Sequence, residues 1–395
     1  MLFIELLLLV YFIYVVLYTS VFSFASFFYH TPEFLKTANA SKFCILVPSY
    51  KEDAVILDSV KQNLNQAYPK QNFDIIVIAD SLQPSTITAL KSLPIKVVEV
   101  NFENSTKVKS LRFALNQLTA YDHAVILDAD NVMQQDFLSQ VDSAINSGHK
   151  VVQGQRMAKN KNNTLARLDG ISEALNNNIY RKGATALNLS SAIVGSGIAF
   201  PFELLKKKIS TMDSVGGFDR ELELLLLREN VKVFYYESAI VLDEKVSQQN
   251  AFQNQRKRWI YSQYFYLKKY FNEGILALLK GNFTFFNSSV LRNIQLPRLI
   301  NIGLLTFVTL IFFFLRDQLI LGYPIWIGLF LLNTLSILVA IPKEYYTKEL
   351  FLAVLKLPII FANMLLLMFK LKGANKKFIH TPHGVTNINS TESNK

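Results

Sequence analysis

Hydrophobic positions follow two different patterns along this chain. Uninterrupted apolar stretches occupy the two ends, at residues 2–28, 297–315, 319–341 and 350–369. Each is close to the roughly 20 residues that a helix needs to cross the hydrocarbon core of a bilayer. The first stretch carries one charge, Glu5, and has neither a basic start nor a clean small-residue cleavage site. It therefore predicts a retained membrane anchor rather than a signal peptide.

The middle of the chain, from about residue 40 to residue 260, has a different pattern. Short apolar runs alternate there with segments of helical periodicity. This alternation predicts an α/β domain with a mostly parallel sheet covered by helices on both faces. The expected strands are residues 44–48, 74–79, 95–100, 123–127 and 231–236, and the expected helices are residues 54–66, 106–118 and 134–145.

A third pattern follows the middle domain. From Trp259 to about Lys280, large apolar residues alternate with lysines and an asparagine. This predicts an amphipathic helix lying on the membrane surface, and a helix packed on the soluble domain is the alternative. The chain thus divides into an N-terminal anchor (1–29), a soluble domain (40–258), an interfacial segment (259–295), a C-terminal membrane region (296–370) and a polar tail (371–395).

Composition and charge fit a membrane protein with a soluble domain. The net charge is +11, but no nucleic-acid-binding motif is present, and lysines beside membrane segments facing an anionic leaflet explain the charge better. The single cysteine, Cys44, rules out a disulfide within the chain and fits a reducing compartment. We therefore expect an integral protein of the inner membrane with a cytoplasmic soluble domain. The last apolar stretch holds Lys356 and Pro358 near its middle, so we expect it to lie at the interface or to re-enter.

The strongest candidate for a binding site in the sequence is Ile126–Asp130, where an apolar run ends in two carboxylates one residue apart. If the run is a strand, Asp128 and Asp130 leave its C-terminal end on the same side. Two hard oxygen ligands at that edge can hold Mg²⁺ or Mn²⁺, and the ion can hold a diphosphate. An Asp-rich turn that simply ends a strand is the commoner explanation of a lone pair. Here Tyr50, Glu52 and Asp80 also follow or end predicted strands, and ligands of such sheets bind at those ends.

Five sequence blocks occur in a fixed order along this domain: VPSYKED (47–53), IVIADS (76–81), KSLRFALN (109–116), ILDADN (126–131) and QRKRW (255–259). The series resembles family 2 glycosyltransferases with the GT-A fold, a Rossmann-like α/β fold, and in particular the membrane-bound polysaccharide synthases. Cellulose, chitin, hyaluronan and poly-N-acetylglucosamine synthases are members of that group. Three further blocks resemble the exopolysaccharide-synthesis branch: VVQGQ (151–155), GSGIAF (195–200) and LDEK (242–245).

The resemblance implies a set of site residues. Pro48, Tyr50 and Glu52 would line a uridine pocket, Asp80 would contact the base or ribose, and Lys109 would lie beside the nucleotide. Asp128 would bind the donor sugar and, together with Asp130, the metal; Gln255, Arg258 and Trp259 match a QxxRW signature near the diphosphate and the acceptor. A guanidinium suits a diphosphate leaving group and an indole face suits a sugar ring. Anchoring at the membrane interface is the alternative for Arg258 and Trp259.

The expected general base is less regular than the other motifs. Sugar transfer with inversion needs one base to take the acceptor proton, and the family places an aspartate there. Register puts Glu221 at that position and Arg220 where an acid is usual. Glu221 and Glu223 also suit the first turns of a helix, where acids favour the dipole.

Together these features predict an inverting glycosyltransferase that moves a sugar from a UDP-sugar to a polysaccharide or glycan acceptor at the bilayer, with Mg²⁺ or Mn²⁺. One alternative is a non-processive transferase that adds one sugar to a lipid-linked acceptor. Another is a non-catalytic homologue that acts as a scaffold among polysaccharide export proteins.

Overall fold

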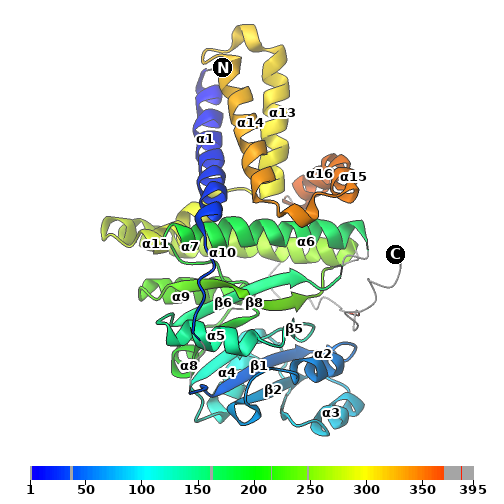
Figure 1. Ribbon diagram of the computed structural model, residues 1–395. Helices are drawn as coiled ribbons and strands as arrows, with labels where there is room; N and C mark the ends of the chain where they lie inside the picture. The colour runs from blue at the N-terminus through cyan, green and yellow to red at the C-terminus, as the bar shows by residue number, and fades with distance from the viewer. Residues whose placement is uncertain are drawn as a thin grey trace.

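The computed structural model describes residues 2–35, 39–160, 163–214, 216–246, 249–368 and 384. Figure 1 shows a sheet domain at one end of the molecule and three long upright helices at the other, with two helices lying across the boundary. The upright helices are α1 (Leu2–Ala25), α13 (Arg298–Phe314) and α14 (Tyr323–Ala340), and the crossing helices are α6 (Thr164–Asn176) and α10 (Gln249–Leu279).

An eight-stranded sheet with the order β3-β2-β1-β4-β7-β6-β8-β5 forms the centre of the lower domain. The first four strands in that order run parallel, as the sequence predicts. The sheet as a whole is mixed, because β7 runs antiparallel to both neighbours and β5 runs antiparallel to β8. The strands are β1 (Phe43–Tyr50), β2 (Phe73–Asp80), β3 (Lys96–Val100), β4 (His123–Ile126), β5 (Val132–Met133), β6 (Val151–Ala158), β7 (Ile198–Pro201) and β8 (Val233–Asp243).

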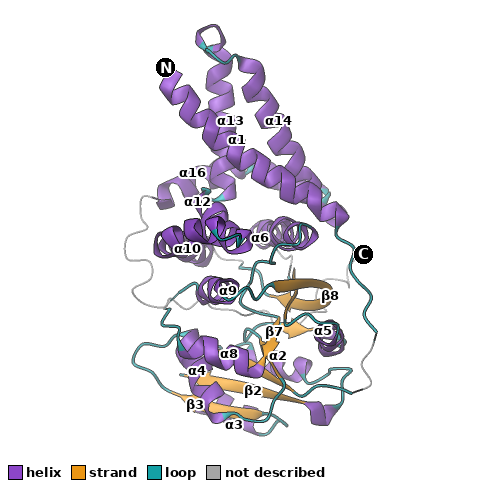
Figure 2. Cartoon of the chain, turned by 90° about the vertical axis from the view of Figure 1, so that its left-hand side faces the viewer, coloured by secondary structure: helices purple, strands orange, loops and turns teal. Residues whose placement is uncertain are grey.

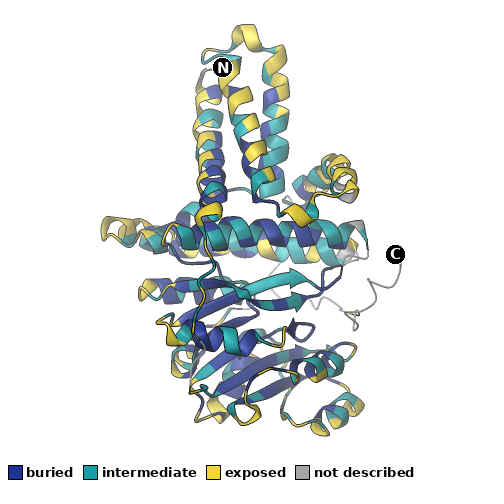
Figure 3. Ribbon diagram, in the orientation of Figure 1, coloured by how far each residue is buried: buried dark blue, intermediate teal, exposed yellow. Residues whose placement is uncertain are grey.

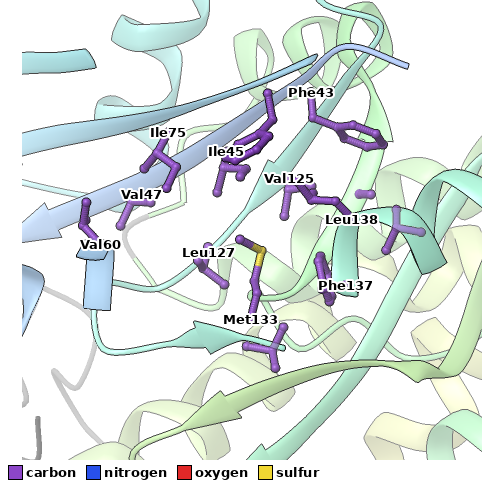
Figure 4. Packing of buried hydrophobic residues seen from close by; sticks show 14 of the residues in the cluster. Phe43, Ile45, Val47, Val60, Ile75, Val125, Leu127, Met133, Phe137 and Leu138 are labelled. Atoms are coloured by element: carbon purple, nitrogen blue, oxygen red, sulfur yellow. The ribbon is translucent and has the colours of Figure 1, made fainter. Parts of the chain in front are cut away.

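Helices cover both faces of the sheet, which confirms that part of the prediction. On one face Val60, Phe137 and Leu138 pack against Ile45 and Val125, as Figure 4 shows. The opposite core joins the sheet to the other helices, and Figure 3 shows β1 and β2 as largely buried. Burying one such apolar side chain contributes about 1.5–3 kcal/mol. The helices are α2 (Ile56–Asn63), α3 (Pro84–Lys91) and α5 (Phe137–Asn146) around the first core, and α4 (Lys107–Gln117), α8 (Phe202–Ser210) and α9 (Phe218–Arg228) around the second.

Two of the described helices are long and apolar enough to cross a membrane, one over Phe3–Phe28 and the other over Tyr323–Ala340. A third span would need Phe283–Ile294 and Arg298–Phe314 to act together, although they are bent by 55° at their junction. The last predicted stretch forms two short helices, α15 (Lys348–Leu355) and α16 (Leu357–Met368), which lie beside the base of α13 and α14 (Figure 1).

The N-terminal helix is fixed by polar contacts to the far end of the sequence. The carboxylate of Glu5, 1% exposed, accepts the backbone N–H of Ile320 at 3.1 Å, across 315 positions of the chain. The hydroxyls of Ser20 and Ser336 lie 2.7 Å apart and are separated by 316 positions. Figure 2 shows α1 lying against α14 from the side. The two ends of the chain therefore form one helical unit.

The predicted amphipathic helix is part of α10, which begins ten residues before Trp259, at Gln249. One side packs on the sheet domain, since Tyr266 and Tyr270 are buried against α9. Phe265 and Leu276 on the same helix are 47% and 55% exposed. The helix therefore packs on the domain along one side and keeps exposed apolar residues that suit a membrane surface.

Candidate active site

The two carboxylates of the ILDADN block lie in the turn after β4, at the edge where the parallel strands end. The backbone N–H of Asp128 donates to the Ser196 hydroxyl at 2.9 Å, which fixes this turn against the loop before β7. The Asp128 side chain is 33% exposed, whereas Asp130 is 4% exposed and accepts the backbone N–H of Glu244 at 3.2 Å. One carboxylate thus faces outward and the other is held inside.

Lys107, which belongs to none of the motifs, lies beside Asp128. The group formed by Lys107, Asp128 and Asp130 is called here the corner. The Lys107 ammonium forms an ion pair with Asp128 and donates to the carbonyl of Gly195 at 2.9 Å. It also lies 4.8 Å from the centre of the Phe218 ring. The signal for it was its place as the first residue of α4, which follows β3 at the same sheet edge. Lys109, the expected lysine, is exposed and donates to the carbonyl of Asn104 at 2.9 Å.

The expected nucleotide pocket lies at the neighbouring ends of β1 and β2. Tyr50 and Asp80 are partners in the strand register, and Pro48 stands two positions before Tyr50 on the same strand. Asp80 is 1% exposed; one carboxylate oxygen accepts the Ser81 hydroxyl at 3.0 Å, and the other has no hydrogen-bond partner among the described residues. A buried acceptor without a partner is costly, so this oxygen is well suited to a hydroxyl or N–H of a ligand. Glu52 follows β1 and is partly buried.

A cavity of about 1120 Å³ begins at Lys107 and Asp128 and continues along α6 and α10 toward the upright helices. Gln255, Arg258 and Trp259 line it, so the structure brings the QRKRW and ILDADN blocks to one space. Trp259 is 41% exposed. Burial lowers the pKa of Arg258, which means that this guanidinium would gain from an anionic ligand.

The structure separates the two acidic residues that could act on an acceptor. Glu221, the expected base, is 5% exposed, forms an ion pair with Lys269 at 2.5 Å and does not line the cavity. Asp219, two residues earlier, does line it, and its Cβ lies 3.4 Å from the position that a Cβ on Gly195 would take. Glu223 is fully buried and bound to Arg292. Asp219 is therefore the cavity-lining carboxylate of α9.

A buried charge network supports the wall behind Asp130. Glu173 on α6 bonds Arg156 at 2.7 Å and Arg181 at 2.9 Å, while Lys245 bonds Asp243 at 2.6 Å. Burial alone would raise the pKa of Glu173, but Arg156, Lys245 and Arg181 outweigh it and hold that pKa well below its usual value. The network ties α6 to the ends of β6 and β8.

Glu244, which follows Asp243, accepts the backbone N–H of Gly384 at 3.1 Å. The two histidines near this glycine in the sequence, His380 and His383, lie outside the described residues. Gly384 thus lies against Glu244, whose backbone N–H bonds Asp130.

The donor set of the corner suits a hard divalent cation. No three His, Cys, Asp or Glu side chains of the described part of the chain gather into a complete metal site. Asp128 and Asp130 would therefore hold Mg²⁺ or Mn²⁺ with further oxygens from a diphosphate and water, which is the usual way these ions are bound at phosphate sites. The bound ion would supply charge to stabilise the departing diphosphate.

An α/β sheet with carboxylates at its strand ends and an adjoining cavity is the arrangement in which such folds bind ligands. The "Glycosyltransferase like family 2" model matches residues 40–262, more than half of the chain. The protein therefore belongs to glycosyltransferase family 2. None of the curated protein sequences matches it.

Three solved structures illustrate what this chain is similar to. A mannosyltransferase from Pyrobaculum calidifontis, in complex with GDP-mannose and Mn²⁺, superposes with a TM-score of 0.53 at 12% identity, covering 90% of this chain and 93% of that one. S. aureus TarS with UDP-GlcNAc gives 0.38 at 15% identity, covering 53% and 60%. Glucosyl-3-phosphoglycerate synthase from Mycobacterium tuberculosis, with Mn²⁺, UDP and phosphoglyceric acid, gives 0.42 at 14%, covering 59% and 82%. The first of these supports a GT-A-like fold for the sheet domain and follows this chain over 90% of its length.

Proposed function

We propose that the protein is an inverting glycosyltransferase that uses a UDP-sugar and Mg²⁺ or Mn²⁺ to glycosylate an acceptor at the membrane surface. The observation that carries this proposal is the single cavity shared by Lys107 and Asp128 at the strand ends and by Arg258 and Trp259 on α10. The donor diphosphate and the acceptor would share this space, whereas Tyr50 and Asp80, which would hold the nucleoside, are not part of its lining.

The donor side follows from the chemistry of the strand ends. Tyr50 offers a ring for stacking and Asp80 an unpaired acceptor for a ribose hydroxyl or a base N–H. Lys107 and Arg258 would neutralise charge on the diphosphate as its bond to the sugar breaks. The choice of uridine rests on the motif resemblance, and the GDP-mannose held by the mannosyltransferase makes GDP-sugars the alternative donors.

Two acceptor classes have support. The ordered motifs favour a growing polysaccharide, with Trp259 as a stacking face for a sugar ring. The cavity favours a lipid-linked acceptor, because it reaches apolar residues of α13, α14 and α16. A hydroxyl acceptor of either class needs a base, and we assign that role to Asp219 in place of Glu221, because Asp219 lines the cavity.

The test is a screen of UDP-sugars and GDP-sugars for metal-dependent release of the nucleoside diphosphate, followed by analysis of the sugar-containing product. Asp128→Asn serves as the inactive variant. We expect release with one donor, dependent on Mn²⁺ or Mg²⁺ and lost in Asp128→Asn. Failure to bind or turn over any donor would instead support a scaffold role beside export proteins.

A further inference from the structure

Three arginines form one group on the wall of the cavity that faces the upright helices. Arg220, Arg292 and Arg298, called here the arginine cluster, all line the cavity. Arg220 and Arg292 share the carboxylate of Glu223, with Arg220 at 3.7 Å from it. The guanidinium groups of Arg292 and Arg298 lie 6.0 and 5.6 Å from the centre of the Tyr180 ring. Shared partners therefore hold the three cations together.

The arginine cluster carries more positive charge than its protein partners balance. Its ion pairs in the described part of the chain all end on Glu223, so Arg220 and Arg292 share one carboxylate. Arg298 bonds the neutral side chain of Asn176 at 2.7 Å and forms no ion pair with a described residue. Arg292 is 7% exposed, and its buried Nε–H has no acceptor among the described residues. Such a site lacks an anion of about two charges with several acceptor oxygens.

Beyond the arginine cluster the cavity becomes apolar. Its far walls come from four helices, and we call this part the apolar trough; it is lined by Phe307, Leu310, Phe330, Leu338, Val354 and Phe361. The hydroxyls of Thr306 and Thr334 in this region donate to carbonyls of their own helices at 2.8 Å. A polar glycan chain would find few hydrogen-bond partners there, whereas an aliphatic chain needs none.

We propose that the acceptor is a long-chain prenyl monophosphate, with its phosphate on the arginine cluster and its chain in the apolar trough. This inference rests on the proposed function and names the acceptor of that reaction. A phosphate monoester carries about −1.5 to −2 charge near neutral pH, which matches the excess charge of the three arginines. The trough adjoins helices that suit a membrane. The prenyl chain could therefore pass from the bilayer into the trough without crossing water.

The chemistry of this acceptor is balanced without a base. A phosphate oxygen of the lipid attacks C1 of the donor sugar, the bond from C1 to the donor diphosphate breaks, and the nucleoside diphosphate leaves with that electron pair. The nucleophile is already ionised, so no proton has to be removed. A reaction without a base agrees with the sequence, in which Arg220 stands where an acid is usual, and with the ion pair that Glu221 forms with Lys269.

Binding of a radiolabelled C55 prenyl monophosphate to the detergent-purified protein tests the inference without depending on donor turnover. We expect Arg298→Gln and Thr334→Trp, which change the arginine cluster and fill the trough, each to weaken binding about tenfold or more. The matched controls are Arg316→Gln, a cation outside the cavity, and Leu335→Trp, next to Thr334 but not lining the cavity. Both controls should bind like the native protein, and the uncharged C55 alcohol should bind more weakly.

A second measurement follows label from the donor sugar into the organic phase in the presence of the same lipid. We expect lipid-soluble product and faster release of nucleoside diphosphate with the monophosphate, and neither with the alcohol. Equal binding of all variants, or label found only in water-soluble polymer, would overturn the lipid-phosphate acceptor. Normal lipid binding without any donor turnover would leave this site standing and would overturn the proposed function instead.

Discussion

Asp130 is the residue whose neutral variant should separate metal chemistry from folding. An asparagine at this position keeps an oxygen that can accept the N–H of Glu244, so the turn should persist. It loses the charge that a hard cation needs. We expect Asp130→Asn to lower metal-dependent release of nucleoside diphosphate by about 10²–10³-fold while the thermal unfolding midpoint stays unchanged. Asp317→Asn, at a side chain that is 94% exposed, is the control; full activity of Asp130→Asn with Mn²⁺ would remove it from the metal site.

Asp219 and Glu221 give a second prediction at this scale. With a hydroxyl acceptor, Asp219→Asn should lower the transfer rate by about 10²–10⁴-fold, because a general base is lost. With a phosphate acceptor the same variant should lose less than about tenfold, since no proton is removed. Glu221→Gln should leave both rates nearly unchanged, because Glu221 is paired with Lys269 and neither residue lines the cavity. If Glu221→Gln is the inactive variant, then Glu221 is the general base, as the alignment with the family motif predicts, and Asp219 is not.

At the scale of elements, the buried charge network makes a prediction about stability and pH. Because its neighbours lower the pKa of Glu173 from the ordinary 4.5, this carboxylate stabilises the fold above that value and loses the effect as the pH falls toward its lower folded pKa. Glu173→Gln should lower the free energy of unfolding by about 3–5 kcal/mol at neutral pH, since one partner of a buried pair is removed. Chemical denaturation at several pH values measures both effects. The native protein should weaken below about pH 4.5, and the variant should show a flatter profile.

The elements also show how far the sequence can predict this fold. The strands that end in the site, β1, β2 and β4, are continuous apolar runs, and each lies where its pattern predicts. The expected strands do not include β5, β6 or β7, because β5 has only two residues, β6 contains polar residues and a glycine, and β7 has only four residues. The sequence pattern predicted that Asp128 lies at a strand end. It could not predict that Lys107 pairs with Asp128, or that Asp219 rather than Glu221 lines the cavity. Those facts depend on the rotation of α4 and α9 against the sheet.

For the whole molecule, the arrangement of domain and upright helices predicts a membrane topology that a single-cysteine experiment can measure. Cys44 is buried, and burial raises the pKa of its thiol, so it should not react and can be replaced by serine. Residue 317 lies between α13 and α14 at the end far from the sheet, and residue 91 lies in the sheet domain. We expect Asp317→Cys to react with an impermeant maleimide in intact cells and Lys91→Cys to react only after lysis. The reverse pattern would place the sheet domain outside.

The contacts of α1 bear on how the protein is made. This helix is synthesised well before α14, and its buried Glu5 and Ser20 find their partners 315 and 316 positions later in the chain. At about 5–20 residues per second, those partners are synthesised roughly 15–60 s after the helix itself. An α1 that spans the bilayer would hold a carboxylate and hydroxyls in lipid throughout that interval, without the partners that they bond in the folded protein. During biogenesis, then, α1 would wait for most of the chain to be made before it reaches its native contacts, and a chaperone that shields its polar side chains would help it meanwhile.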